Sequence, residues 1–255
     1  MPRLETLRRR YVIKGILRAI TPLHIGRGRG EPELGEADLP ILKLADGRPY
    51  IPGSSIKGCI RAEAERILTG LGIRVCIYEK SAANIAPDYR CGPEKPCASC
   101  EIFGSTEMSS RVIIRDALPL QKTPAEVRTG IALERDTRTV APGRLFEIEY
   151  VPPGVEFELE IVVENPEPWM LGLLFLVLRS LSVLGGQGSR GMGKVEFRLE
   201  RIEVWTPNSI IEQRAEEVYE DDKLEEFIET CKRTFKENIG ELKERYGGLT
   251  LGEEY

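Results

Sequence analysis

Strand-like and helix-like segments follow one another in this chain in an order that few folds accommodate. Alternating apolar and polar residues predict strands, and apolar residues at helical spacing predict helices. Strands are expected at residues 11–20, 111–120, 146–151, 155–163 and 194–204, and helices at residues 54–68 and 169–184. Strand–helix–strand–strand–helix–strand with long insertions is typical of an α+β, ferredoxin-like (RRM-like) βαββαβ core. The open sheet face of such a core is a common platform for RNA.

Serine residues predict where the first helix begins. Ser54 or Ser55 is expected to cap it, because a serine oxygen accepts hydrogen bonds from the free N–H groups of a helix end. The apolar face of this helix is expected to consist of Ile56, Ile60, Ala64 and Ile67.

Insertions and an extension surround this core. Residues 71–110 form a Cys-rich insertion that also contains several prolines, and residues 121–145 are polar and irregular in pattern. We divide the chain into a core domain at residues 1–205 and an acidic, helical extension at residues 206–255. From about residue 209 to residue 246 the extension offers a partly apolar face, made of Val218, Leu224, Phe227, Ile228, Cys231, Phe235 and Leu242.

The charge of the chain is unevenly distributed. The net charge of −5 disfavours nucleic-acid binding when it is taken alone. However, residues 206–255 contain 14 acidic and 7 basic residues, whereas residues 1–205 contain 27 acidic and 29 basic residues. The core is therefore close to neutral, and the overall charge is a poor guide to its partners.

The apolar segments are too short for a membrane protein. The longest, residues 169–178, is ended by Arg179, and the N-terminal residues lack the apolar stretch of a signal peptide. We expect a cytoplasmic protein with no membrane partner. Only three Gln and four Asn occur, and depletion of these thermolabile amides indicates a thermophilic source.

Four cysteines of the insertion have a spacing typical of metal ligands. Cys97 and Cys100 form a CxxC pair, in which two thiolates can meet one tetrahedral ion. Cys91 precedes the pair, and Cys76 is the natural fourth ligand. Structural zinc is the favoured interpretation, with disulfides or free buried thiols as alternatives.

A glycine-rich loop lies between the last predicted core helix and strand. It carries glycines at 185, 186, 188, 191 and 193, with Arg190 among them. Glycines permit close backbone approach, so the loop's amides can face a phosphate while Arg190 adds positive charge. A tight turn between helix and strand explains the same glycines without any ligand.

Four further motifs precede this loop in the chain: Leu-His-Ile-Gly at 23–26, Gly-Glu-Ala-Asp-Leu-Pro at 35–40, Ile-Pro-Gly-Ser-Ser-Ile-Lys-Gly at 51–58 and Cys-Ala-Ser-Cys-Glu-Ile-Phe-Gly-Ser at 97–105. In this order, the five motifs resemble the RAMP superfamily of CRISPR proteins, in particular the backbone subunit of type III effector complexes. The resemblance covers residues 10–205 and does not reach the acidic extension. Related subunits carry zinc in the Cys-rich insertion.

The resemblance implies that Asp38 is the catalytic residue. In this family the residue that cuts RNA is an aspartate in a Gly-x-x-Asp-x-Pro context, which Asp38 occupies here. A carboxylate can hold a divalent metal such as magnesium, or take part in proton transfer while a ribose 2′-hydroxyl attacks its own phosphate. Without the resemblance, a lone loop aspartate would be interpreted as a turn residue.

The resemblance also places the RNA-binding residues. His24 is the only histidine, which excludes a catalytic histidine pair within one subunit; it either packs against the first strand or lines the RNA path. The stretch 134–144 resembles a thumb hairpin that folds over the RNA and separates short stretches of base pairing. The residues expected to contact RNA are His24, Arg27, Arg29, Ser54, Ser55, Lys57, Arg61, Arg135, Arg138, Gly188 and Arg190.

The function implied is that of a subunit that polymerises on CRISPR RNA and cleaves guide-paired target RNA as a metal-dependent endoribonuclease. Its expected partners are CRISPR RNA, target RNA, further copies of itself and other type III effector subunits. Two alternatives remain: a non-catalytic filament subunit, and an endoribonuclease that processes CRISPR RNA. The single histidine disfavours the second, because processing relatives often use histidine.

Overall fold

The computed structural model describes residues 6–28, 37–76, 91–92, 94–136 and 139–247. In chain order, the elements are β1 (Arg10–Ala19), α1 (Gly53–Gly70), α2 (Ala98–Phe103), β2 (Val112–Ile114), β3 (Glu126–Leu133), β4 (Val140–Tyr150), β5 (Glu156–Glu164), α3 (Pro168–Ser180), the 3₁₀ turn η2 (Gly188–Arg190), β6 (Val195–Trp205), α4 (Pro207–Ile211), β7 (Glu217–Glu220) and α5 (Asp221–Tyr246).

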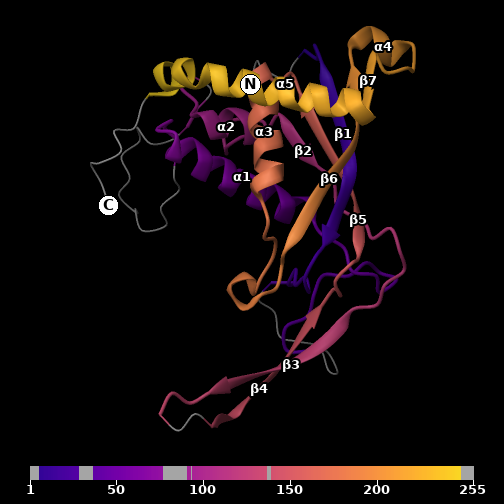
Figure 1. Cartoon of the computed structure of the whole chain (residues 1–255), viewed down its shortest axis with the longest axis vertical. Helices are drawn as coiled ribbons and strands as arrows, with labels where there is room; N and C mark the ends of the chain where they lie inside the picture. Colours follow the sequence, from indigo (N-terminus) through magenta and orange to yellow (C-terminus); the bar gives the residue numbers. More distant parts are fainter. Residues whose placement is uncertain (1–5, 29–36, 77–90, 93, 137–138, 248–255) are drawn as a thin grey trace.

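Two antiparallel sheets confirm the predicted α+β class. The larger sheet has five strands in the order β2-β5-β1-β6-β7, and β3 pairs with β4 in a separate hairpin. In Figure 1 the hairpin projects from one end of the molecule, and α5 runs across the opposite end. The core and the projecting hairpin are therefore distinct structural parts.

One face of the large sheet is covered by helices. Alternate residues of β1 and β5 are buried, as period-two patterning predicts, and α1 and α3 lie on that side of the strands (Figure 1). Gly15 marks a bulge in the pairing of β1 with β6, where an added Cβ atom would lie 2.2 Å from the backbone oxygen of Arg198.

The other face of the sheet carries ion pairs. Arg10 pairs with Glu164 across β1 and β5, and Lys14 lies 3.2 Å from Glu203 of β6. Glutamates also occupy the remaining outward positions of β5, apart from Val162. Neither β1 nor β5 presents an aromatic residue on this face, but Trp205 of β6, which is in register with the outward-facing Arg10, lies on it and donates its indole N–H to Glu203.

Several boundaries differ from the prediction. Helix α1 begins at Gly53 with Pro52 at its N-cap, and no serine side chain caps it, so the predicted cap is wrong. The buried face of α1 includes Leu68, whereas Ile67 is only partly buried. Residues 126–133 and 140–150 form β3 and β4, although residues 121–145 were expected to be irregular.

The acidic extension packs on the helical layer. Its predicted apolar face is largely correct, because Leu224, Cys231, Phe235 and Leu242 are buried on α5. Val218 instead lies in β7, an edge strand of the large sheet. Within the described part of the chain, no helix is both long and apolar enough to cross a membrane.

Candidate functional site

Asp38 lies at the surface beside the base of the β3–β4 hairpin. Its Oδ2 atom accepts a hydrogen bond of 2.8 Å from the backbone N–H of Glu147 in β4. The next residue, Leu39, exchanges backbone hydrogen bonds of 2.9 and 3.0 Å with Glu147 and Glu149. Strand β4 therefore fixes an exposed carboxylate whose second oxygen, Oδ1, has no hydrogen-bond partner among the described residues.

The side chain of Glu149 holds the chain segment that follows Asp38. Its Oε2 atom accepts a hydrogen bond of 3.0 Å from the backbone N–H of Ile41, and its Oε1 atom forms an ion pair with Lys43. Glu149 is buried. A buried carboxylate is tolerated where it is paired and hydrogen-bonded, so these contacts fix the chain that follows Asp38 against β4.

His24 lies at the centre of the predicted motifs. Its Nδ1 atom is 2.7 Å from the backbone oxygen of Glu149, and because a carbonyl only accepts, Nδ1 carries the proton. The backbone oxygen of His24 accepts a hydrogen bond of 2.9 Å from Gly186 of the glycine-rich loop. His24 is only 8% exposed, so most of its imidazole is a packing element that joins loop and hairpin.

The glycine-rich loop needs its glycines for close approach. Gly185 has a φ of +82°, and an added Cβ atom there would lie 2.4 Å from the backbone oxygen of His24. Gly193 also has a positive φ and donates its N–H to Pro22. Gly188 and Arg190 form the 3₁₀ turn η2, where the exposed guanidinium of Arg190 donates to the side chain of Gln187.

The N-terminus of α1 differs from the expected phosphate site. Ser54 and Ser55 occupy its first turn, but the N–H of Gly53 is taken by the carboxylate of Asp116, at 2.8 Å. The N–H of Ser55 donates to the backbone oxygen of Pro52. A carboxylate at this end repels a phosphate, which weakens the physical basis for an RNA contact here.

Two predicted RNA-binding cations are engaged inside the protein. Lys57 donates to the hydroxyl of Ser110 at 2.7 Å and to the backbone oxygen of Val112 at 2.9 Å. Its burial, followed by the nearby charge of Arg61, lowers the pKa of its ammonium group. Arg61 contacts Glu65 and the Cys100 sulfur. Both cations hold α1 to its neighbours.

The remaining predicted RNA contacts are exposed or lie outside the described residues. The backbone N–H of Arg27 donates to Pro40, two residues after Asp38, so the Arg27 segment and the Asp38 segment are adjacent. Arg135 is exposed near the tip of the hairpin. Arg29 and Arg138 lie outside the described residues.

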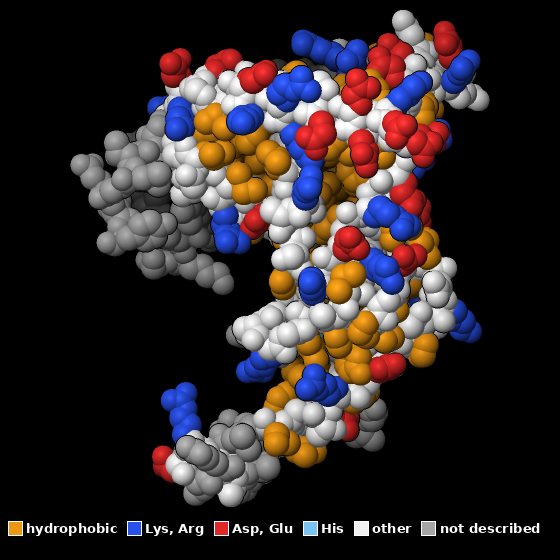
Figure 2. Space-filling view, viewed as in Figure 1, with side chains coloured by type: hydrophobic (Ala, Val, Ile, Leu, Met, Phe, Trp, Pro, Cys, Tyr) orange, Lys and Arg blue, Asp and Glu red, His pale blue; other side chains and the backbone are white. Residues whose placement is uncertain are grey.

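The hairpin exposes three apolar side chains that were not predicted from the sequence. Val127, Ile131 and Leu145 point to the same side of the two paired strands and are 53%, 51% and 64% exposed, with the exposed Thr129 and Glu147 between them. Hydrophobic side chains gather on this end of the molecule in Figure 2.

The four cysteines of the insertion converge on one point. The sulfur atoms of Cys76, Cys91, Cys97 and Cys100 all lie within 4.8 Å of one another. The Cys76 and Cys100 sulfurs are 3.2 Å apart, and those of Cys76 and Cys97 are 3.6 Å apart. Around a tetrahedral zinc, sulfurs are separated by about 3.8 Å. These residues could therefore hold a metal, and no pair is close enough for an S–S bond of about 2.05 Å.

Electrostatics in the cluster favour a thiolate. Cys97 is the N-cap of α2, and its sulfur accepts a hydrogen bond from the N–H of Cys100. The Cys100 and Cys76 side chains lower the pKa of the Cys97 thiol. Thiolates are the form in which cysteine binds metals. Among the described residues, this is the only place where three or more His, Cys, Asp or Glu ligand atoms lie close enough together to share one metal ion.

The order and placement of these motifs identify the class of protein. The family model of the RAMP superfamily matches residues 16–196, so the chain belongs to the RAMP superfamily, as the resemblance implied. The matched range contains Asp38, the cysteine cluster and the glycine-rich loop.

Within this class, the chain is similar to proteins named CRISPR system Cms endoribonuclease Csm3. It is 28% identical to the one from Methanocaldococcus jannaschii over 96% of this chain and 98% of that protein. It is 32% identical to the one from Methanothermobacter thermautotrophicus, over 75% of this chain and 85% of that protein. The protein from Mycobacterium tuberculosis is 30% identical over 72% and 85%. The family model ends before the acidic extension, as expected, whereas the match to the Methanocaldococcus jannaschii protein covers 96% of the chain and therefore includes most of residues 206–255.

Proposed function

We propose that this chain is a CRISPR-RNA-binding backbone subunit of a type III interference complex and that it cleaves guide-paired target RNA at Asp38. The observation that carries the proposal is the exposed Asp38 carboxylate, which β4 fixes through the N–H of Glu147 within the motif that specifies cleavage. The similar proteins bear the name endoribonuclease, which supports the same activity.

The chemistry available at Asp38 is limited to what one carboxylate can do. Asp38 would accept the proton of a ribose 2′-hydroxyl while the 2′-oxygen attacks the adjacent phosphorus. The bond from phosphorus to the 5′-oxygen of the next nucleotide would break, and water would protonate that oxygen. A bound magnesium ion would stabilise charge on the phosphate. Magnesium commonly uses one or two carboxylates together with waters and phosphates, so a single aspartate is a sufficient protein ligand.

We place the RNA path at the end of the core where the motifs meet. Arg27 is adjacent to the Asp38 segment, Arg190 lies in the glycine-rich loop that hydrogen-bonds His24, and Arg135 lies on the hairpin. The exposed side chains of Ile131 and Leu145, which pair across the hairpin, suit insertion between bases, which would separate short paired stretches as the family resemblance implies. The open sheet face is a poorer alternative, because its cations Arg10, Lys14 and Arg201 are paired with glutamates.

Other parts of the proposal concern the fold and the metal. The strand order β2-β5-β1-β6 supports a ferredoxin-like core, as does the chain order, in which α1 lies between β1 and β2 and α3 lies between β5 and β6. The spacing of the four sulfurs supports structural zinc. Zinc would join Cys76 and Cys91 to α2 and so stabilise the fold directly. Further copies of the chain and other effector subunits would assemble along the guide.

The cleavage assignment is tested in a complex assembled with guide RNA. Asp38→Ala should abolish cleavage of paired target RNA and leave guide and target affinity within about twofold, because one surface carboxylate adds no affinity for phosphate. Asp46→Ala is the matched control, since Asp46 is exposed on the same stretch of chain and contacts only Arg48 among the described residues. EDTA should stop cleavage by the wild type.

The outcomes separate the alternatives. Cleavage at the wild-type rate by the Asp38→Ala complex would exclude Asp38 as the catalytic residue. A wild-type complex that binds but never cuts would indicate a non-catalytic filament subunit. Cleavage of unprocessed repeat RNA, but not of paired target, would indicate a guide-processing enzyme.

A further inference from the structure

We infer that the last turn of α5 positions the two halves of the cysteine cluster, so that the acidic extension is a structural part of the metal site. The inference rests on the proposed zinc site. The two halves are distant in sequence: Cys76 follows α1, whereas Cys97 and Cys100 flank and occupy α2. Consecutive residues at the end of α5 contact the chain beside each half.

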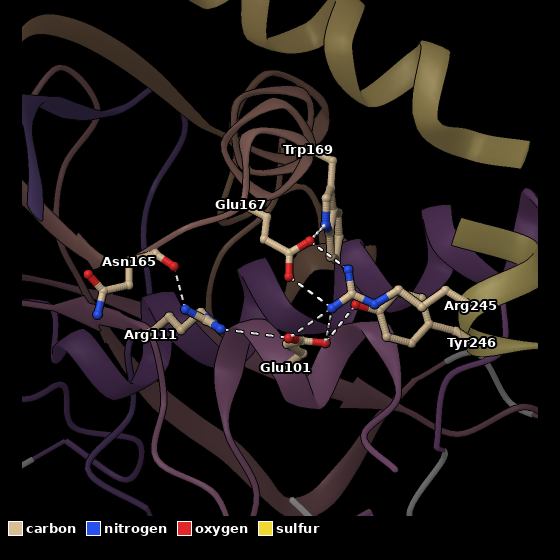
Figure 3. Close-up of polar contacts among 7 residues, drawn as sticks. All are labelled: Glu101, Arg111, Asn165, Glu167, Trp169, Arg245 and Tyr246. Carbon is tan, nitrogen blue, oxygen red and sulfur yellow. Dashed lines mark hydrogen bonds and ion pairs between the residues drawn. The ribbon is translucent and has the colours of Figure 1, made fainter. Parts of the chain in front are cut away.

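The first contact is to α2. Glu101 follows the ligand Cys100 directly, and its carboxylate is buried in a cage of donors (Figure 3). The hydroxyl of Tyr246 donates to it at 2.6 Å, and Arg245 donates at 3.3 and 3.4 Å. Both donors come from α5. Arg111 lies 3.6 Å away on the opposite side.

The second contact is to the chain that carries Cys76. The backbone oxygen of Gly247 accepts a hydrogen bond of 3.1 Å from the N–H of Arg74, two residues before Cys76. Ile73 and Val75, on either side of Arg74, are buried. Residues 245–247 therefore contact both halves of the cluster within a single turn of chain.

The end of α5 is itself anchored to the core. The guanidinium of Arg245 forms two hydrogen bonds, of 2.6 and 2.8 Å, with the carboxylate of Glu167 before α3. Glu167 also accepts a hydrogen bond from the indole N–H of Trp169, whose ring packs edge-on against Tyr246 at a centroid distance of 6.0 Å. Because the guanidinium is planar and makes two hydrogen bonds to one carboxylate, it fixes the orientation of Arg245 relative to Glu167.

Burial explains why these contacts position α2. Glu101 is 2% exposed, so its carboxylate has no access to bulk water and depends on Arg111, Arg245 and Tyr246. A buried carboxylate that loses its donors is left uncompensated and moves toward solvent. Such a movement displaces α2, and with it the sulfurs of Cys97 and Cys100. Groups that orient metal ligands commonly change metal affinity by about 10–100-fold when they are mutated.

The experiment compares zinc release from full-length variants. Tyr246→Phe removes one hydroxyl, and Glu101→Gln removes the charge that it contacts. Arg233→Gln is the control, because Arg233 is exposed on the same helix. Zinc-loaded proteins are mixed with an excess of a chromogenic chelator, and we expect both test variants to release zinc at least about tenfold faster than the wild type and the control.

A second measurement separates positioning from general stabilisation. If α5 positions the ligands, added zinc should raise the Tm of Tyr246→Phe by less than it raises the Tm of the wild type. Equal increases, together with release rates equal to those of Arg233→Gln, would overturn this inference alone. A wild-type protein that contains and binds no zinc would overturn the proposed metal site and this inference with it.

Discussion

Two buried glutamates, Glu149 and Glu101, determine how the two candidate sites are held. Each carboxylate has partners from segments distant in sequence: residues 41–43 for Glu149 and the end of α5 for Glu101. Neither was identified as a site residue from the sequence. Glu149 occupies a strand position that alternation assigns to the same side as Glu147, and only the tertiary structure shows that one is buried and the other exposed.

Glu149→Ala should lower cleavage without abolishing RNA binding. The substitution leaves the N–H of Ile41 without its acceptor and Lys43 without its partner, so the segment that carries Asp38 is held less firmly. We expect a fall in Tm and about a tenfold or greater loss of cleavage rate, since misplacement by an ångström can cost more than this. The measurements are thermal unfolding and single-turnover cleavage in the guide-loaded complex.

Glu147→Ala is the control for that substitution. Glu147 is exposed and neighbours the same segment, but it fixes Asp38 through its backbone N–H, which alanine retains. Its complex should cleave at close to the wild-type rate. Equal losses in the two variants would show that Glu149 has no particular role in placing Asp38.

At the level of elements, hydrophobic periodicity predicted the strands and helices that bury one side in the core, and it did not predict the strands that project into solvent. Strands β1, β5 and β6 and helices α1 and α3 were found because one side of each carries apolar residues into the core. The β3–β4 hairpin projects into solvent and its pattern is mostly polar, so β3 and the first half of β4 were missed, whereas a strand was expected at residues 146–151. The N-terminus of α1 was misplaced because its capping carboxylate, Asp116, comes from another part of the chain.

The predicted sites show the same division. The cysteine spacing was sufficient to predict a cluster, and the four sulfurs do converge. The RNA-binding cations were chosen by sequence neighbourhood alone, and for Lys57 and Arg61 the nearest partners proved to be internal. Burial of a long cationic side chain depends on what packs over it, which local sequence does not specify.

The packing of α5 on α3 depends on one glycine, and this can be tested by substitution. An added Cβ atom at Gly172 would lie 2.1 Å from the backbone oxygen of Cys231 on α5. Gly172→Ala should therefore force the helices apart and lower the free energy of unfolding by about 1–3 kcal/mol. Chemical denaturation of the purified chain measures this change.

The matched control is Gly240→Ala on α5, where an added Cβ atom meets nothing within 4 Å. Alanine is the better helix former, so this variant should be more stable than the wild type by up to about 1 kcal/mol. If Gly172→Ala were equally stabilised, α3 and α5 would not be in close contact in solution.

At the scale of the whole molecule, the acidic extension and the core share one interior. Leu224, Phe235 and Leu242 of α5 belong to the same hydrophobic core as β1 and α3. The extension thus covers the helical layer at the end opposite the hairpin (Figure 1), and its negative charge is distant from the Asp38 segment. The net charge of the chain therefore conceals a separation of an acidic end from the proposed RNA path.

This separation predicts that an arginine-to-glutamate substitution weakens guide RNA binding at one position of the molecule and not at another. Arg190→Glu in the glycine-rich loop should weaken guide RNA binding by several-fold and reduce its salt dependence, because a cation near phosphates is replaced by an anion. Arg18→Glu on the open sheet face, where Arg18 is exposed and paired in register with Glu156 and Glu196, should leave guide affinity within about twofold. Guide affinity of the assembled complex is measured at two or more salt concentrations. A loss confined to Arg190→Glu would support the path proposed beside Asp38. A loss for Arg18→Glu as large as that for Arg190→Glu would contradict it, because the effect would then not depend on position.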